Sequence, residues 1–124
     1  MPTLVIIGGG PAGLSAAIYA VRAGLDVHVL YKDDGALGKT DKIENYFGFP
    51  DVISGAELLS RGRAQAERLG AQLHRTEVTG IEYADTGFAV KTTDGERHAD
   101  AVLLATGSPR AVPAITGIRT FEGR

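Results

Sequence analysis

The sequence predicts an α/β fold in which a parallel sheet opens with a β–α–β unit and a small antiparallel β-meander follows. The opening rests on an apolar run at Thr3–Ile7 that ends in glycines, an alanine-rich stretch after it, and a second apolar run at Asp26–Tyr31. The later part of the chain instead has short segments separated by turn residues. With 124 residues, the chain is long enough for one domain with one core, so residues 1–124 are taken as a single Rossmann-like domain.

The opening β–α–β unit follows from the local pattern. A strand is expected at Thr3–Ile7, because an unalternated run rich in β-branched residues is typical of a strand buried on both faces of a parallel sheet. A helix over Ala12–Ala23 follows, with Gly24 as its stop signal. The strand Asp26–Tyr31 then completes a unit of about 30 residues, which is the expected size.

The next segment, Lys32–Pro50, is rich in glycine, aspartate and lysine. Loops of this length are uncommon in compact domains unless they bind something, so we expect a functional loop that holds at most a turn of helix. Ser54 is a candidate helix N-cap, with Glu57 as its capping-box partner. That helix is expected to run to about Leu69 and to stop at Gly70.

The rest of the chain is predicted to be mainly β structure. Three short strands are expected, at Gln72–His74, Glu77–Tyr83 and Phe88–Thr93. Hairpin turns are expected at Ala84–Gly87 and Asp94–Gly95. Arg97–Ala105 is expected to return as one strand that becomes fully apolar towards its end, and Val112–Arg124 is interpreted as an extended tail.

Composition and charge argue against several classes of function. The formal net charge of −2 provides no basic field to attract nucleic acid or an anionic membrane. No apolar run approaches the roughly 20 residues of a membrane helix, no signal peptide is expected, and we expect a cytoplasmic protein. The chain has no cysteine, so it cannot carry a redox-active cysteine pair. His28, His74 and His98 have no partners at metal-ligand spacing and are interpreted as strand or surface residues.

The strongest local motif is the segment 8–13, whose glycines match the dinucleotide-binding pattern G-x-G-x-x-G. Gly8 would permit the tight turn, Gly10 would let a diphosphate approach the backbone, and Gly13 would let the helix pack against the strand. Pro11 and Ala12 open the helix, where free amides and the macrodipole favour an anion. The alternative is a flexible turn with no ligand, but such a turn does not need glycine at all three positions.

The adenosine end of the predicted site departs from the usual pattern. An acidic residue that binds the ribose hydroxyls is expected at the end of the second strand. Tyr31 stands at that position, and Lys32, Asp33 and Asp34 follow it directly. Asp33 could reach the ribose and Lys32 could meet a phosphate, but a solvated loop explains these charges equally well.

Several segments together resemble the N-terminal FAD half of thioredoxin reductase-like flavoproteins. The matching segments are 8–13, Ile43–Pro50, Ser54–Leu59, Gln65–Ala71 and Ala105–Arg110. The resemblance covers essentially the whole chain, and Ile43–Pro50 is more specific to the family than the glycine motif. It implies that the cofactor is FAD.

The resemblance also implies roles for residues outside the glycine motif. Asn45 would lie near the flavin or its ribityl chain, although an asparagine can also simply form a turn by bonding its own backbone. Val78 would offer its backbone groups to adenine. The small residues Ala105, Thr106 and Gly107 would let the backbone lie close to the dinucleotide, and an ordinary strand-to-loop turn is the alternative.

The chain also departs from the family. Family members continue into an NADPH-binding domain, which usually carries a C-x-x-C pair, and then return to complete the FAD site. All of these parts are missing here, and Gly35-Ala36-Leu37 stands where many relatives carry Gly-Gly-Gln. We therefore expect the FAD-binding portion of an NAD(P)H-dependent flavin oxidoreductase, with no catalytic residue and no disulfide reductase activity of its own. Binding of NAD(P)H would need the missing second domain.

Other interpretations stay open at this stage. The chain could be a complete module that carries FAD or another adenine nucleotide for a partner subunit, or a truncated gene product with an incomplete core. NAD(P) could occupy the glycine-turn site. A partner subunit or a second copy of the chain could complete the FAD site.

Overall fold

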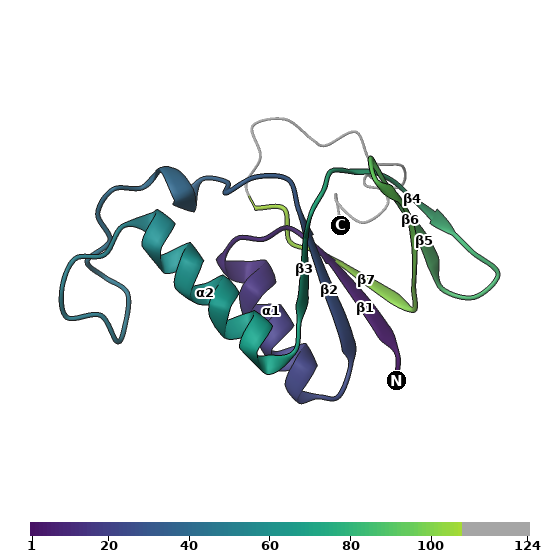
Figure 1. Cartoon of the computed structure of the whole chain (residues 1–124), viewed down its shortest axis with the longest axis horizontal. Coiled ribbons are helices and arrows are strands. Elements are labelled where there is room, and N and C mark those ends of the chain that lie inside the picture. Colours follow the sequence, from purple (N-terminus) through teal and green to yellow (C-terminus); the bar gives the residue numbers. More distant parts are fainter. Residues whose placement is uncertain (108–124) are drawn as a thin grey trace, which may run out of the picture.

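A four-stranded parallel sheet forms the centre of the fold (Figure 1). The structure, a computed structural model, describes residues 1–107, so the predicted tail Val112–Arg124 lies outside the described residues. The strands of this sheet are β1 (Thr3–Ile7), β2 (Asp26–Tyr31), β3 (Gln72–Arg75) and β7 (Ala101–Leu104). Their order is β3-β2-β1-β7, and every neighbouring pair is parallel. The predicted β–α–β opening is confirmed.

Two α-helices cover one face of this sheet. Helix α1 (Pro11–Arg22) has proline at its first position, where the missing N–H costs nothing. Helix α2 (Gly55–Leu69) begins as predicted, because the Ser54 hydroxyl accepts a hydrogen bond from the Glu57 N–H at 3.1 Å. The Glu57 carboxylate pairs with Arg61 at 2.8 Å instead of returning to the cap, so only half of the predicted capping box forms. The preceding loop contains one short 3-10 helix, η1 (Leu37–Lys39).

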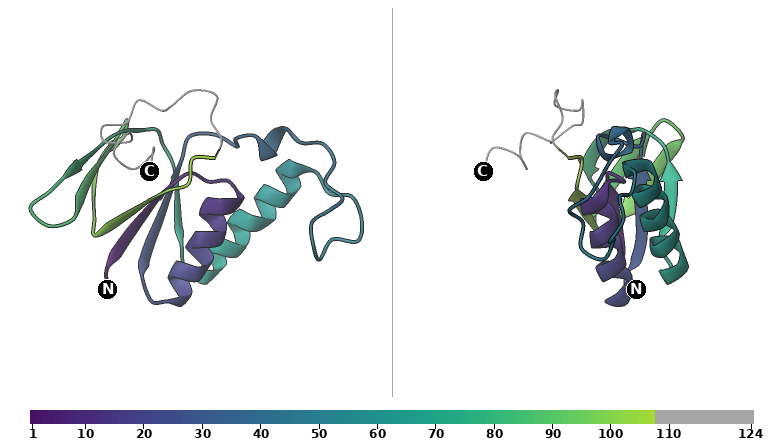
Figure 2. Two further views of the ribbon diagram at one scale, coloured as in Figure 1. Left: turned by 180° about the vertical axis from the view of Figure 1, so that it is seen from behind. Right: turned by 90° about the vertical axis from the view of Figure 1, so that its left-hand side faces the viewer.

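An antiparallel sheet covers the opposite face of the parallel sheet (Figure 2). It consists of β4 (Val78–Tyr83), β5 (Phe88–Thr92) and β6 (Gly95–Ala99), which confirms the predicted meander. No helix within residues 1–107 has the length and apolarity needed to cross a bilayer.

The prediction of a single strand over Arg97–Ala105 is wrong, because the chain changes sheets in the middle of this segment. β6 pairs antiparallel with β5, whereas β7 pairs parallel with β1. Asp100 marks the change: its N–H donates to the Thr3 carbonyl at 2.9 Å and its carboxylate accepts from the Thr3 N–H at 2.7 Å. This bonding joins residues far apart in sequence, so local patterning could not reveal it.

The apolar core lies on both faces of the parallel sheet, as the unalternated apolar runs indicate. Ile6 and Val29 are fully buried towards the helices, where they belong to a cluster with Leu59 of α2. Val5 and Leu30 face the antiparallel sheet and pack with Val90. Neighbouring residues of β1 and β2 thus enter different clusters because successive side chains of a strand point to opposite faces.

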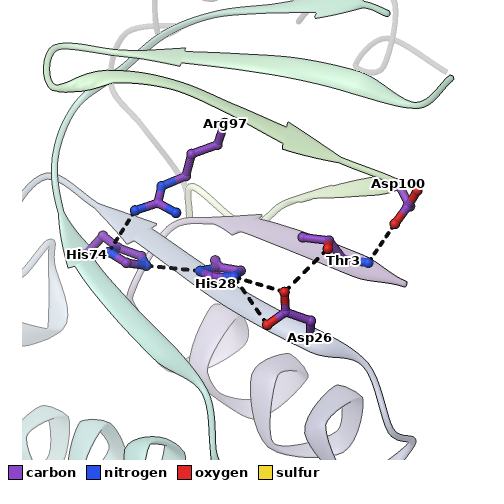
Figure 3. A network of polar contacts seen from close by, with 6 residues as sticks. All are labelled: Thr3, Asp26, His28, His74, Arg97 and Asp100. Carbon is purple, nitrogen blue, oxygen red and sulfur yellow. Dashed lines mark hydrogen bonds and ion pairs between the residues drawn. The ribbon is translucent and has the colours of Figure 1, made fainter. Parts of the chain in front are cut away.

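A polar network joins the two sheets beside the apolar core (Figure 3). Arg97 of β6 reaches the Nδ1 atom of His74 on β3 at 3.1 Å. His74 Nε2 lies 3.0 Å from Nδ1 of His28 on β2, and His28 Nε2 lies 3.2 Å from the Asp26 carboxylate. His28 and His74, two of the histidines that the sequence placed on strands, are therefore linked in one chain of contacts from a guanidinium to a carboxylate.

The direction of the hydrogen bonds in this chain follows from Arg97. A guanidinium only donates, so His74 Nδ1 must accept, and neutral His74 then carries its proton on Nε2. His74 donates this proton to His28 Nδ1, and His28 donates its Nε2–H to Asp26. Protonation of His74 at Nδ1 would place the new N–H group against the N–H donor of Arg97. Burial, together with the charges of Arg97 and His28, accordingly lowers the pKa of His74.

We predict that the protein loses stability as the pH falls below neutrality. The pKa of His74 is lower in the folded chain than the ordinary value of about 6.5 in the unfolded chain, so the unfolded state binds the proton first. The stability that neutral His74 contributes is complete well above pH ~6.5 and declines as the pH falls through it. Urea unfolding between mildly acidic and mildly alkaline pH measures this slope.

A histidine variant provides the matched comparison. His74→Gln keeps one donor and one acceptor but cannot titrate, so it should flatten the dependence of the unfolding free energy on pH. His98→Gln, which changes an exposed histidine of β6 whose ring contacts the Thr86 carbonyl, lies outside the network and is the control variant. Equal slopes for wild type and His74→Gln would show that the network does not act through His74.

Candidate dinucleotide-binding site

A cavity of about 800 Å³ lies at the carboxyl ends of β1, β2 and β7. Its volume falls within the range of roughly 300–1,000 Å³ that is usual for small-molecule and cofactor sites. In the sheet, β2 lies on one side of β1 and β7 lies on the other. Such a reversal of strand order leaves a crevice at the carboxyl ends of the strands, which is where open α/β sheets bind their ligands.

Most of the residues predicted from the sequence to bind the dinucleotide meet in this cavity. Those that line it are Gly8, Gly10, Pro11, Ala12, Tyr31, Lys32, Asp33, Val78, Ala105, Thr106 and Gly107. Gly13 and Asn45 do not line it. Four separate segments of the chain contribute this lining, and the fold brings them together.

Gly8 holds the turn after β1 against the two neighbouring strands. Its φ of +121° is one that side chains disfavour, and a Cβ at this position would collide with the Ala105 carbonyl. Its N–H donates to the Leu30 carbonyl at 2.8 Å. The predicted tight turn is therefore present, and it requires glycine for both conformation and space.

Gly13 contributes to packing and does not contact the cavity. The residue is buried, and a Cβ on it would collide with the Gly8 carbonyl and lie 3.4 Å from Ile6 Cγ2. The absence of a side chain thus lets α1 start directly against the end of β1. This agrees with the close helix–strand packing predicted for this glycine.

Gly10 has open space where a side chain would be. Apart from its chain neighbours, no described heavy atom lies within 4 Å of the position of its missing Cβ. Its φ of −82° is accessible to any residue, so the backbone conformation does not call for glycine here. What glycine provides at this position is room for a ligand to approach the backbone.

The first turn of α1 presents unpaired donors beside this open space. The first main-chain bond of the helix runs from the Leu14 N–H to the Gly10 carbonyl at 3.0 Å. The N–H groups of Ala12 and Gly13 have no acceptor among residues 1–107, and Pro11 has no N–H. No acidic side chain stands in this first turn, so the positive end of the helix dipole is free to meet an anion.

The end of β2 carries a cluster of charges beside Tyr31. The guanidinium groups of Arg63 and Arg75 lie 4.6 and 5.9 Å from the centroid of the Tyr31 ring. Arg63 also donates to Asp34 at 2.8 Å, and this hydrogen bond is the main reason that the pKa of Asp34 is lowered. Asp33 accepts the Gly35 N–H at 2.9 Å, so it stabilises its own turn.

The connection between β3 and β4, with the start of β4, contributes cavity residues that the sequence did not reveal. Thr76, Glu77 and Thr79 line the cavity together with Val78. Glu77 stands 3.7 Å from Lys32, measured from its Oε2 atom to the lysine Nζ. The expected role of Val78 pointed to this part of the chain, but no local signal placed Glu77 opposite Lys32.

Asn45 lies in an exposed part of the long loop, outside the cavity. An antiparallel bridge between Ile43 and Ile53 closes the segment that contains Asn45, with N···O distances of 2.7 and 3.1 Å. Phe47, between them, is 97 % exposed. The role of Asn45 at the flavin stays a prediction.

Comparison with known proteins relates this chain to a family of oxidoreductases. Residues 2–124 match the family model for pyridine nucleotide-disulphide oxidoreductases. The chain belongs to this family. It is 43 % identical to the thioredoxin reductase of Aquifex aeolicus over 124 residues and 43 % identical to that of Streptomyces coelicolor over 125 residues, with 98 % of this chain covered in both comparisons.

Solved structures of thioredoxin reductases share the fold. The atypical thioredoxin reductase TRi from Desulfovibrio vulgaris Hildenborough is 46 % identical, with a TM-score of 0.82 over 99 % of this chain. The thioredoxin reductase from Gloeobacter violaceus is 37 % identical, with a TM-score of 0.84 over 98 % of this chain. The resemblance to thioredoxin reductase-like proteins that the sequence indicates is therefore confirmed.

The similarity involves only part of each relative. This chain spans 38 % of the Aquifex enzyme and 42 % of each of the two solved chains. The activity of the whole oxidoreductases therefore does not transfer directly to residues 1–124 of this family member.

Two glycine variants should separate packing from ligand space at this turn. Gly13→Ala should lower the free energy of unfolding by about 1–3 kcal/mol, because its methyl group would press on the Gly8 carbonyl. Gly10→Ala, placed in open space with an unstrained backbone, should cost less than about 1 kcal/mol, which is the loss expected for alanine at the N-cap of α1. Urea unfolding of both variants measures the difference, and equal losses would contradict the assignment of roles.

Proposed function

We propose that this chain binds FAD in the cavity at the carboxyl ends of β1, β2 and β7. The observation that carries the proposal is the glycine turn, where the free amides of Ala12 and Gly13 stand next to the open space at Gly10. A diphosphate is the group that this arrangement fits, because it needs anion-binding N–H donors and a backbone that it can approach closely. Membership in the family and the Ile43–Pro50 segment favour FAD over NAD(P) as the dinucleotide.

The other predicted residues have roles along the same ligand. Gly8 would hold the turn, and Pro11 would fix the start of the helix that receives the diphosphate. Lys32, Asp33 and the backbone of Val78 would meet the adenosine part. Ala105, Thr106 and Gly107 would lie against the dinucleotide, with Asn45 towards the flavin. When bound, the flavin would supply the electron-transfer chemistry, and these residues would supply binding and orientation.

We further propose that this binding unit is the FAD part of a thioredoxin reductase-like, NAD(P)H-dependent flavin oxidoreductase. Reduction of a disulfide by thiol exchange needs a thiolate, and residues 1–124 contain no cysteine. The thiol pair and the nicotinamide site would therefore come from other sequence or from a partner subunit, whereas a partner subunit or a second copy of the chain would complete the FAD site. The composition supports a cytoplasmic location for this assembly.

Binding of FAD is tested by isothermal titration or by quenching of flavin fluorescence. The wild-type chain should bind FAD more tightly than NAD⁺ or NADPH. Gly10→Ala should weaken FAD binding at least tenfold, because its methyl group would occupy the approach to the backbone, and tenfold corresponds to about 1.4 kcal/mol. Unchanged affinity in Gly10→Ala would mean that the diphosphate does not sit at this turn.

Disulfide reduction is tested separately. With FAD bound, the chain should not oxidise NADPH in the presence of an aromatic disulfide faster than free FAD does, because it provides no thiol. Absorbance of NADPH follows the reaction. Sustained turnover by the purified chain alone would contradict the proposal that the missing groups come from elsewhere.

A further inference from the structure

The end of β2 offers no carboxylate to the ribose of an adenine dinucleotide. In dinucleotide-binding folds this position usually carries an acidic residue that accepts hydrogen bonds from the ribose hydroxyls. Here Tyr31 occupies it, with the guanidinium groups of Arg63 and Arg75 near its ring. The hydroxyls of a bound ribose would need another acceptor, since leaving donors unpaired in a binding site weakens binding.

The two aspartates that follow β2 are already engaged. Asp33 accepts the backbone N–H of Gly35 at 2.9 Å. Asp34 accepts a hydrogen bond from Arg63 at 2.8 Å, and this contact is also an ion pair. Either carboxylate would have to bind a ligand while it keeps a contact that shapes the start of the loop, whereas the Glu77 carboxylate has no such contact to keep among residues 1–107.

Glu77 reaches the same place from another part of the chain. The N–H of Thr76 donates to the carbonyl of Tyr31 at 2.9 Å, which fastens the β3–β4 connection to the end of β2. Glu77 is the next residue, and it lines the cavity together with Tyr31 and Lys32. Its carboxylate lies 3.7 Å from the Lys32 ammonium, which is longer than a hydrogen bond, so its oxygens are free to accept from a ligand.

We propose that Glu77 replaces the usual acidic residue and accepts the hydrogen bonds of the adenosine ribose. Lys32 acts as a positioning residue, because its ammonium group attracts the Glu77 carboxylate towards the end of β2. This inference rests on the proposed function, namely that an adenine dinucleotide binds in this cavity. The residue that recognises the ribose thus comes from the β3–β4 connection and not from the second strand.

The charges at this end of the cavity also favour a ribose without a 2′-phosphate. A 2′-phosphate is normally received by a nearby arginine. Here Arg63 is paired with Asp34, Lys32 faces Glu77, and Arg75 does not line the cavity. The Glu77 carboxylate would repel a phosphate placed beside it. We therefore expect the site to prefer the unphosphorylated ribose of FAD or ADP.

The test compares ADP with 2′,3′-dideoxy-ADP, which lacks both ribose hydroxyls, by isothermal titration. Wild type should bind ADP at least tenfold more tightly than the dideoxy analogue. In Glu77→Gln, which loses the charge of the acceptor, this ratio should fall below about threefold, since hydrogen bonds to charged groups are the stronger ones. Glu82→Gln is the matched control, because Glu82 pairs with Lys91 on the antiparallel sheet and does not line the cavity.

The outcomes separate this inference from the proposed function. If wild type binds FAD and ADP but Glu77→Gln keeps the full ratio between ADP and the dideoxy analogue, Glu77 is not the acceptor, while FAD binding stands. Tighter binding of adenosine 2′,5′-bisphosphate than of AMP would also overturn the inference. If wild type binds neither FAD nor ADP, the proposed function fails and the ribose assignment fails with it.

Discussion

Three backbone segments meet without intervening side chains at the carboxyl end of β1, and the site depends on this contact. A Cβ on Gly8 would collide with the Ala105 carbonyl, and a Cβ on Gly13 would collide with the Gly8 carbonyl. The turn, the start of α1 and the end of β7 can therefore approach one another only because both residues are glycine. With this contact in place, the N–H groups of Ala12 and Gly13 stay unpaired within residues 1–107, beside the open space at Gly10. The same contact thus determines both the packing of the β–α–β unit and the place of its unpaired N–H donors.

The two faces of the parallel sheet have different partners. Towards the helices, the contacts are apolar, with Ile6 and Val29 fully buried. Towards the antiparallel sheet, an apolar cluster around Val5 and Leu30 is accompanied by the network from Asp26 through His28 and His74 to Arg97. Apolar packing has no direction, whereas these hydrogen bonds fix which donor faces which acceptor. The network therefore adds a specific connection between β2, β3 and β6.

Attachment of the antiparallel sheet matters for the cavity because the β3–β4 connection forms part of its wall. Thr76 bonds to the end of β2, and Val78 and Thr79 line the cavity at the start of β4. The pairing of Thr3 with Asp100 similarly sets the point at which the chain leaves β6 and enters β7, whose end carries Ala105 to Gly107. Contacts distant from the glycine turn in the sequence thus complete the site that this turn begins.

The sequence by itself determined the elements whose signals are local. The strands Thr3–Ile7 and Asp26–Tyr31 have the predicted bounds, and helix α2 begins at the predicted Ser54 cap, because propensity, capping and burial pattern act within a few residues. The roles of Gly8 and Gly13 were also predictable, since the motif describes one continuous segment. Only the tertiary structure decided that Arg97–Ala105 divides between two sheets and that Glu77 stands opposite Lys32. These features depend on pairing between segments distant in the chain, for which a single sequence contains no local signal.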